Sequence, residues 1–128
     1  MIAGKVFQLL SSSGIEGLNQ DSVFAYRVSP SATQEDYQLQ VLVTDVLEAP
    51  DAQGSDSFRA YEQRVNVKIF FPVDYEGDFH TVQNDIIKFM KDNKYRFHDS
   101  SGVLALPDTE RLTVSLQFWH TEVLDNAL

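Results

Sequence analysis

The chain has 128 residues, of which 43% are hydrophobic and 23% charged, a composition that predicts one domain with its own hydrophobic core. Its formal net charge of −9 argues against a surface that binds nucleic acid or an anionic membrane, since both need basic patches. It has no cysteine, which excludes disulfides, thiol nucleophiles and thiolate metal sites.

The lack of cysteine and of a signal-peptide pattern at the N-terminus predicts a protein that is made and assembled in a cytoplasm. Met1-Ile2-Ala3-Gly4-Lys5 is not a basic region leading into an apolar stretch. Nowhere do about 18 apolar residues follow one another, so we expect no transmembrane span, and with the net charge of −9 we expect no membrane partner.

The first half of the chain predicts a helix followed by strands. Ile2, Val6, Leu9 and Leu10 recur at helical spacing, and the alternation of Leu39, Val41 and Val43 with polar residues is typical of a half-buried strand. We predict a helix over 2–12, strands over 22–28, 37–47 and 58–71, and a long acidic hairpin loop at about 47–57.

The second half predicts another helix and a β-meander. Asp78 is a favourable N-cap, Phe79, Val82, Ile86, Phe89 and Met90 form a helical stripe, and Asn93 is expected to end the helix in a left-handed conformation. Lys88 and Lys91 are expected in its last turn. Strands are predicted over 94–98, 103–106 and 111–121.

These elements predict a single domain over residues 1–128 of the α+β class. Its order is α-β-β-β-α-β-β-β, with an antiparallel or mixed sheet and both helices packed on one face. This arrangement would bury every apolar stripe described above.

The sequence does not predict catalysis. His80, His98 and His120 lack the spacing of a metal site, and neither a nucleophile elbow nor a glycine-rich phosphate loop is found. The acidic residues fall in loops and at helix starts, where they normally cap and solvate. We therefore expect no catalytic residue, no metal and no cofactor, and interpret the chain as a protein that is not an enzyme.

Two groups of residues instead predict contacts with other subunits. Trp119 and Phe70 fall on otherwise polar strand faces, which indicates cover either by the chain's own loops or by a partner. A basic run also contrasts with the acids of the 45–57 segment, a charge separation that suits head-to-tail docking, although lysines at a helix end explain the run equally well. The candidate interface residues are Glu48, Asp51, Asp56, Phe70, Lys88, Lys91, Lys94, Arg96 and Trp119.

Local phrases over residues 60–121 give a resemblance to a known class of protein. Arg64–Phe71 reads R-V-x-V-x-I-F-F, and an acidic loop and an amphipathic helix follow. Ser101-Gly102, Pro107–Thr109 and Leu112–His120 continue the pattern. In these features the chain resembles the small tail-assembly proteins of siphophages that infect Gram-positive bacteria, of the tail terminator type.

The resemblance implies a structural virion protein that forms a ring, commonly a hexamer. Such a ring caps the tail tube and meets the head connector, so the implied partners are copies of itself, the tube protein and the connector protein. It also implies assembly in the bacterial cytoplasm and residence in the virion tail. DNA would pass through the acidic lumen without specific binding, and the 47–57 loop would reach a neighbouring subunit.

Two further hypotheses stay open at this point. A head–tail joining protein, of the neck or stopper kind, has similar size and composition. A small-ligand or peptide-binding module that uses the sheet around Trp119 is the third.

Overall fold

A computed structural model describes residues 2–27, 38–50, 60–73, 75–105 and 111–123. Within them the chain forms two helices and six strands, in the order predicted from the sequence. The bounds are α1 Ile2–Ser11, β1 Val23–Ala25, β2 Gln40–Pro50, β3 Ala60–Phe70, α2 Phe79–Asp92, β4 Arg96–Ser100, β5 Leu104–Ala105 and β6 Leu112–Val123.

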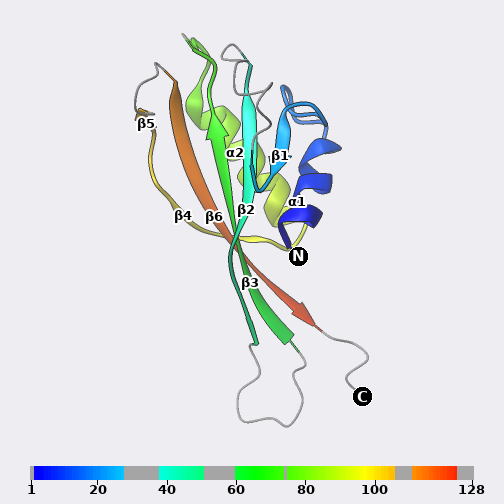
Figure 1. The fold of residues 1–128 in the computed structure, drawn as a ribbon. Coiled ribbons are helices and arrows are strands. Elements are labelled where there is room, and N and C mark those ends of the chain that lie inside the picture. The colour runs from blue at the N-terminus through cyan, green and yellow to red at the C-terminus, as the bar shows by residue number, and fades with distance from the viewer. Residues whose placement is uncertain (1, 28–37, 51–59, 74, 106–110, 124–128) are drawn as a thin grey trace.

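The strands form one mixed sheet in the order β1-β2-β3-β6-β4, with β5 also paired to β6 (Figure 1). β1 runs parallel to β2, whereas β2, β3, β6 and β4 pair antiparallel. The long central strands are in register from Phe70 opposite Thr113 to Ala60 opposite Val123. The α+β prediction with an antiparallel or mixed sheet is therefore confirmed.

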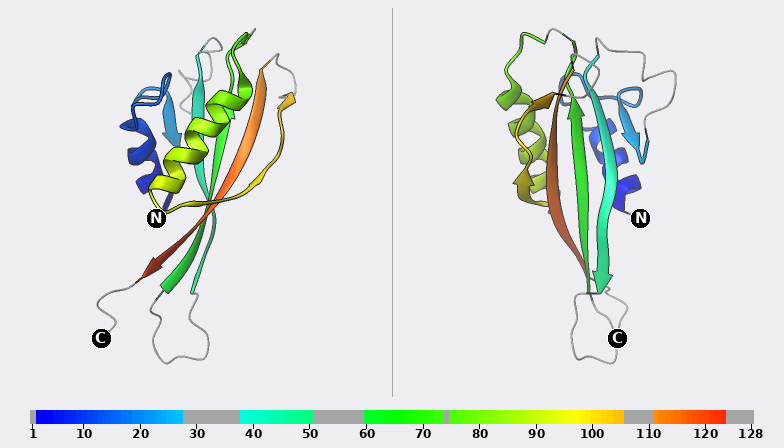
Figure 2. Two further views of the ribbon diagram at one scale, coloured as in Figure 1. Left: turned by 180° about the vertical axis from the view of Figure 1, so that it is seen from behind. Right: turned by 60° about the vertical axis from the view of Figure 1, so that its left-hand side comes forward.

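Both helices cover the same face of the sheet, as the view from behind shows (Figure 2). The inward residues predicted for β3, namely Val65, Val67, Ile69 and the following Phe71, are fully buried. They pack with the apolar stripes of the helices into one core, whose fully buried residues also include Ala3, Val6, Leu10, Val41, Val43, Ile86, Met90, Val114, Leu116 and Phe118. We call this side the helix-covered face and the other side the open face.

The end of α2 follows a Schellman motif rather than a left-handed asparagine. Asn93 is the C-cap with φ −101°, and Lys94 has the left-handed φ of 74°. The amide of Lys94 donates to the carbonyl of Lys91, and that of Tyr95 donates to the carbonyl of Met90. Tyr95 and Met90 are both buried, which supplies the apolar contact of the motif. The prediction for Asn93 was thus wrong by one residue.

The other predicted strand bounds also differ from the structure by a few residues, as does the place of Lys88. β1 is shorter than predicted, because Tyr26 has a φ of 71° that no strand can continue through. β2 runs to Pro50, so the segment from 47 to 50 is paired strand, and the hairpin connection lies at 51–59, outside the described residues. Only Lys91 lies in the last turn of α2, because the helix ends at Asp92 and leaves Lys88 one turn earlier.

Candidate functional site

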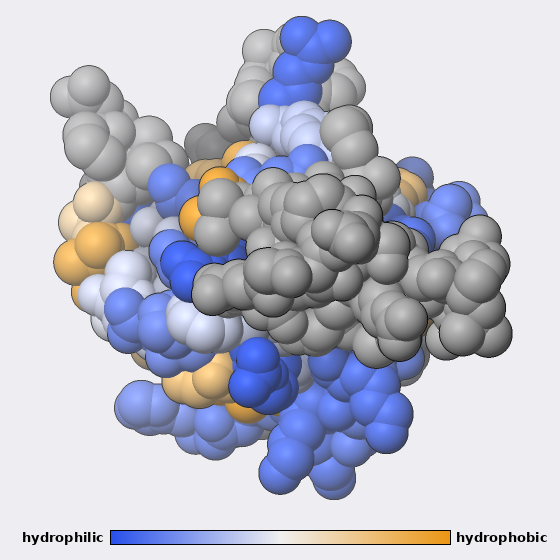
Figure 3. All heavy atoms as spheres, turned by 90° about the horizontal axis from the view of Figure 1, so that it is seen from below, coloured by the Kyte–Doolittle hydropathy of each residue, from blue (hydrophilic) through white to orange (hydrophobic). Residues whose placement is uncertain are grey.

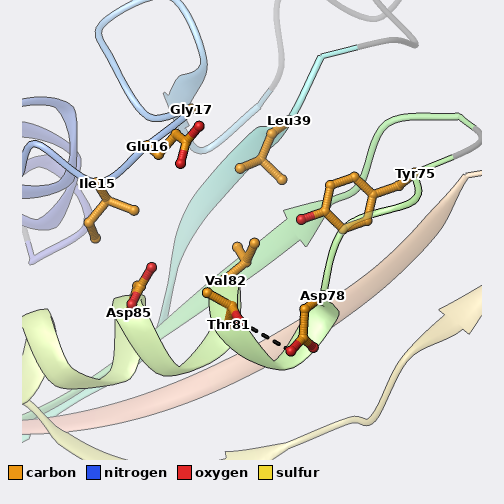
Figure 4. A pocket seen from close by; sticks show the side chains of 9 residues that line it. All are labelled: Ile15, Glu16, Gly17, Leu39, Tyr75, Asp78, Thr81, Val82 and Asp85. Carbon is orange, nitrogen blue, oxygen red and sulfur yellow. Dashed lines mark hydrogen bonds between the residues drawn. The ribbon is translucent and has the colours of Figure 1, made fainter.

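A pocket of about 330 Å³ opens between the α1–β1 connection and the N-terminal half of α2 (Figure 4). In Figure 4, Tyr75 points its hydroxyl into the hollow from the β3–α2 connection, facing the Ile15 side. The volume is near the lower end of the range of about 300–1,000 Å³ typical of small-molecule sites. The lining residues are Ile15, Glu16, Gly17, Leu39, Tyr75, Asp78, Thr81, Val82 and Asp85.

Close packing fixes the walls of this pocket. Gly17 has a φ of +88°, and a Cβ at this position would lie 3.0 Å from Cδ2 of Leu39, so the turn requires glycine. On the other side, the rings of Phe71, Tyr75 and Phe79 pack against one another, with centroids 4.6 to 5.3 Å apart. A side chain at Gly77 would overlap the Tyr75 ring. The walls of the pocket are therefore set by packing against the Phe71, Tyr75 and Phe79 rings and by the turn at Gly17.

The rim of the pocket is acidic. Asp78 is the N-cap of α2: its Oδ1 accepts from the His80 amide at 2.9 Å and its Oδ2 from the Thr81 hydroxyl at 3.2 Å. These bonds, first that of the His80 amide, lower the pKa of Asp78 below its usual 3.8. Glu16 and Asp85 are exposed, and their carboxylates make no hydrogen bond or ion pair to a described residue. The pocket thus combines apolar walls with an acidic rim.

On the open face, Trp119 is half-buried under side chains of its own sheet. Arg64, its partner on β3, places its guanidinium carbon 4.1 Å from the ring centroid, and that of Arg96 on β4 lies 6.0 Å away. The His98 ring lies 4.4 Å from Trp119, tilted by 33°. The buried indole Nε1 has no hydrogen-bond partner among the described residues. The subunit itself therefore supplies much of the cover that the sequence indicated for Trp119.

Phe70 lies on the same face and is also covered from within the chain. The Lys68 ammonium is 5.4 Å and the Arg111 guanidinium carbon 5.7 Å from the Phe70 ring centroid.

Sequence reasoning missed Arg111, which is 4% exposed. Its guanidinium donates to the carbonyl of Phe71, to Oε1 of Gln40 and to the carbonyl of Gln38. Arg111 thus ties the starts of β2 and β6 to the end of β3.

The acidic residues of the 45–57 segment do not all lie in a loop. Asp45 is a strand residue: its Oδ1 accepts from the Ala3 amide in the first turn of α1, and its Oδ2 accepts from the Tyr26 hydroxyl. Glu48 lies in β2 opposite Gln63, whereas Asp51 and Asp56 lie outside the described residues. Asp45 therefore fastens α1 to the sheet.

The basic residues follow one path from α2 into β4. Lys88 and Lys91 lie on α2, Lys94 ends it and Arg96 begins β4, and all four are exposed. Arg96 pairs with Trp119, which pairs with Arg64 opposite Leu47. The end of β2 that carries Glu48 therefore lies at the same height in the sheet as Arg96 on β4. The two strands are about 14 Å apart, which is three strand spacings. Seen from below, hydrophilic residues predominate on the described surface and hydrophobic ones form small patches (Figure 3).

The three histidines lie in separate surroundings. His80 is exposed at the start of α2, His98 lies on Trp119, and His120 stacks on Tyr95 with centroids 4.5 Å apart. Nδ1 of His120 is 3.1 Å from the Lys94 carbonyl, to which it donates when it carries the proton.

The described residues contain no group of three metal-ligating side chains, and none of their helices is long and apolar enough to span a membrane.

Comparisons with known proteins identify the family. No curated protein matches the chain. Residues 3–122 match the family described as Protein of unknown function (DUF806). Because this match covers nearly the whole chain, the protein belongs to the DUF806 family.

Proposed function

We propose that this chain is a non-enzymatic tail terminator subunit of a siphophage. In this proposal several copies, six in the arrangement that the resemblance implies, form a ring that caps the tail tube and meets the head connector. The assembled protein resides in the virion tail, and DNA passes through the ring without specific binding. The resemblance over residues 60–121 and the helix–strand order support this proposal.

The observation that carries the proposal is an extension of the sheet beyond its helices. The lower ends of β2, β3 and β6 continue past both helices as a narrow three-stranded ribbon (Figures 1 and 2). The contact of Asp45 with the first turn of α1 lies near this limit, and β2 pairs with β3 for several residues beyond it, to Pro50 opposite Tyr61. A ribbon on which neither described helix packs gains little stability from those helices. We infer that another protein covers it.

The residues at the base of this ribbon suit an interface. Trp119, Arg64 and Arg96 form one row across β3, β6 and β4. Tryptophan and arginine are enriched among the residues that carry most of the binding energy in protein–protein interfaces. The row lies on the open face, so a neighbouring subunit can contact it without displacing a helix.

The net charge of −9 fits the passage of DNA through the ring. Phosphates are repelled by an acidic wall, so DNA would slide through without being held. The acidic residues predicted for the hairpin loop, Glu48, Asp51 and Asp56, would then serve either the lumen or a neighbouring subunit.

Assembly in solution and on tail tubes tests the proposal. Size-exclusion chromatography with light scattering, followed by negative-stain imaging, should show a ring whose mass is a multiple of that of the 128-residue chain. The same protein should bind the ends of purified tail tubes. Strictly monomeric protein that fails to bind tubes would contradict the proposal, and retention by connector protein alone would favour a head–tail joining role.

A charge-neutralised variant sharpens this test. Glu48→Gln, Asp51→Asn and Asp56→Asn together should weaken assembly or tube binding. The matched control carries Asp21→Asn, Asp92→Asn and Asp99→Asn, which removes the same charge from exposed positions elsewhere. Equal behaviour of the two variants would show that total charge matters, not the ribbon.

A further inference from the structure

We propose that the acidic pocket at the start of α2 receives a lysine from a second copy of this chain, with Lys91 as the inserted residue. The inference rests on the proposed ring and names the contact that would close it. One subunit would give Lys91 to its neighbour on one side and receive a lysine in its own pocket on the other.

The chemistry of the pocket fits a lysine side chain. Ile15, Leu39 and Val82 provide apolar walls for the methylene stem, and the carboxylates of Glu16 and Asp85 stand at the rim for the ammonium. Of the described residues that line the pocket, none is basic. Lysine side chains bury their stems along apolar surface while the charged end seeks polar partners. The volume of about 330 Å³ is sufficient to admit one long side chain.

The complementary charge lies at the other end of the same helix. Lys91 is exposed in the last turn of α2, and its ammonium makes no ion pair with a described residue. Asp85, the pocket residue of α2 nearest to Lys91, lies six residues earlier, about 9 Å along the helix axis and about 120° around it, so Lys91 points away from the pocket of its own chain. Lys88 is excluded as the inserted residue because it lies within one turn of Asp85. Lys91 can therefore meet the carboxylates of the pocket only in another copy of the chain.

This geometry gives a head-to-tail contact. The donor residue and the pocket lie at opposite ends of α2 in each subunit, so the contact uses two different surfaces and repeats from copy to copy. Such a heterologous contact generates a ring when the rotation between neighbours closes.

Charge exchange within one chain tests the inference. Asp85→Lys and Lys91→Glu, each alone, should raise the apparent dissociation constant of assembly by about tenfold or more, because each places like charges together. The double variant, which carries both substitutions, should recover most of the assembly, because it restores the pair with its signs exchanged. Light scattering over a concentration series measures all of them.

Two control variants make the same charge changes elsewhere. Asp99→Lys lies on β4 and Arg27→Glu follows β1, both exposed and outside the pocket. We expect both to assemble like the wild-type chain. If the wild-type chain forms rings and neither single variant weakens them, the pocket contact is wrong while the proposed function stands. If the double variant is as weak as the single ones, the pairing is also wrong.

A small-molecule occupant would give a different result. The diamine 1,5-diaminopentane is a probe of the pocket as a ligand site. If this probe raises the Tm of the wild-type chain at micromolar concentration and Asp85→Lys leaves assembly intact, the pocket binds a small cation and the inference is overturned. A wild-type chain that stays monomeric at every concentration overturns the inference and the proposed ring together.

Discussion

The two faces of the sheet use the same strands but are covered in different ways. On the helix-covered face, Val67, Leu116 and Phe118 are fully buried beneath the helices. On the open face, Trp119 and Phe70 are half-buried beneath cationic side chains of the sheet itself. The neighbours Phe118 and Trp119 belong to opposite faces. Alternation therefore tells which residues share a face, whereas the structure tells what covers them.

The largest effect is expected on the helix-covered face. Phe118→Ala removes a fully buried ring and should lower the free energy of unfolding by about 3–5 kcal/mol, because the cavity cannot collapse between sheet and helices. Urea unfolding followed by circular dichroism measures this loss. Phe97→Ala is the control: its ring meets Phe118 edge-on but is 44% exposed, so a loss of only about 1 kcal/mol is expected. Equal losses would show that the helices do not seal this face.

The second effect concerns the buried Arg111. Arg111→Lys keeps the charge but cannot reach the acceptors at Phe71, Gln40 and Gln38 together, so buried oxygens lose their donors. We expect a loss of about 2–3 kcal/mol in the free energy of unfolding, measured by the same urea titration. The control Arg27→Lys is exposed and should change little. If Arg111→Lys leaves the free energy of unfolding unchanged, water replaces these hydrogen bonds.

A smaller effect on stability is expected for Trp119→Ala. The residue is half-buried, its indole N–H has no partner among the described residues, and its cover is the cationic group of Arg64. We expect the isolated subunit to lose about 1–2 kcal/mol, clearly less than Phe118→Ala. Assembly should weaken by about 2 kcal/mol or more if a neighbour contacts this row.

Trp119→Phe serves as the control for this prediction. Phenylalanine keeps an aromatic ring under Arg64 and removes the unpaired indole N–H, so the stability of the subunit should be almost unchanged. If Trp119→Ala costs the isolated subunit as much as Phe118→Ala, Trp119 is a core residue and the open face contributes to folding like the covered one.

The sequence predicted the fold well because most of it depends on local periodicity. Alternation along β3 and the stripe of α2 identified core residues such as Val67 and Ile86, and Asp78 was recognised as the N-cap. The end of α2 was missed because a lysine occupies the left-handed position where glycine is usual.

The candidate sites were harder to predict because they depend on contacts between distant segments. The pocket brings residues near 16, 39 and 85 together, and no local spacing indicates such a meeting. Arg111 and Asp45 are likewise explained by partners 71 and 42 residues away. The sequence signal for Arg111 was only its position as a charged residue directly before an apolar strand.

The smallest effect is expected at the rim of the pocket, where Asp78 caps α2. Hydrogen bonds from the His80 amide and the Thr81 hydroxyl hold the pKa of Asp78 below 3.8 in the folded chain. A lowered pKa means that the ionised cap stabilises the fold above the unfolded value and that this contribution is lost as the pH falls through the lower folded value. Asp78→Asn keeps an N-cap but does not titrate. The Tm advantage of the wild-type chain over Asp78→Asn should therefore hold at neutral pH and disappear as the pH falls below 3.8. Thermal unfolding at a series of pH values measures it, and an advantage that grows on acidification would contradict the assignment of Asp78 as an ionised cap.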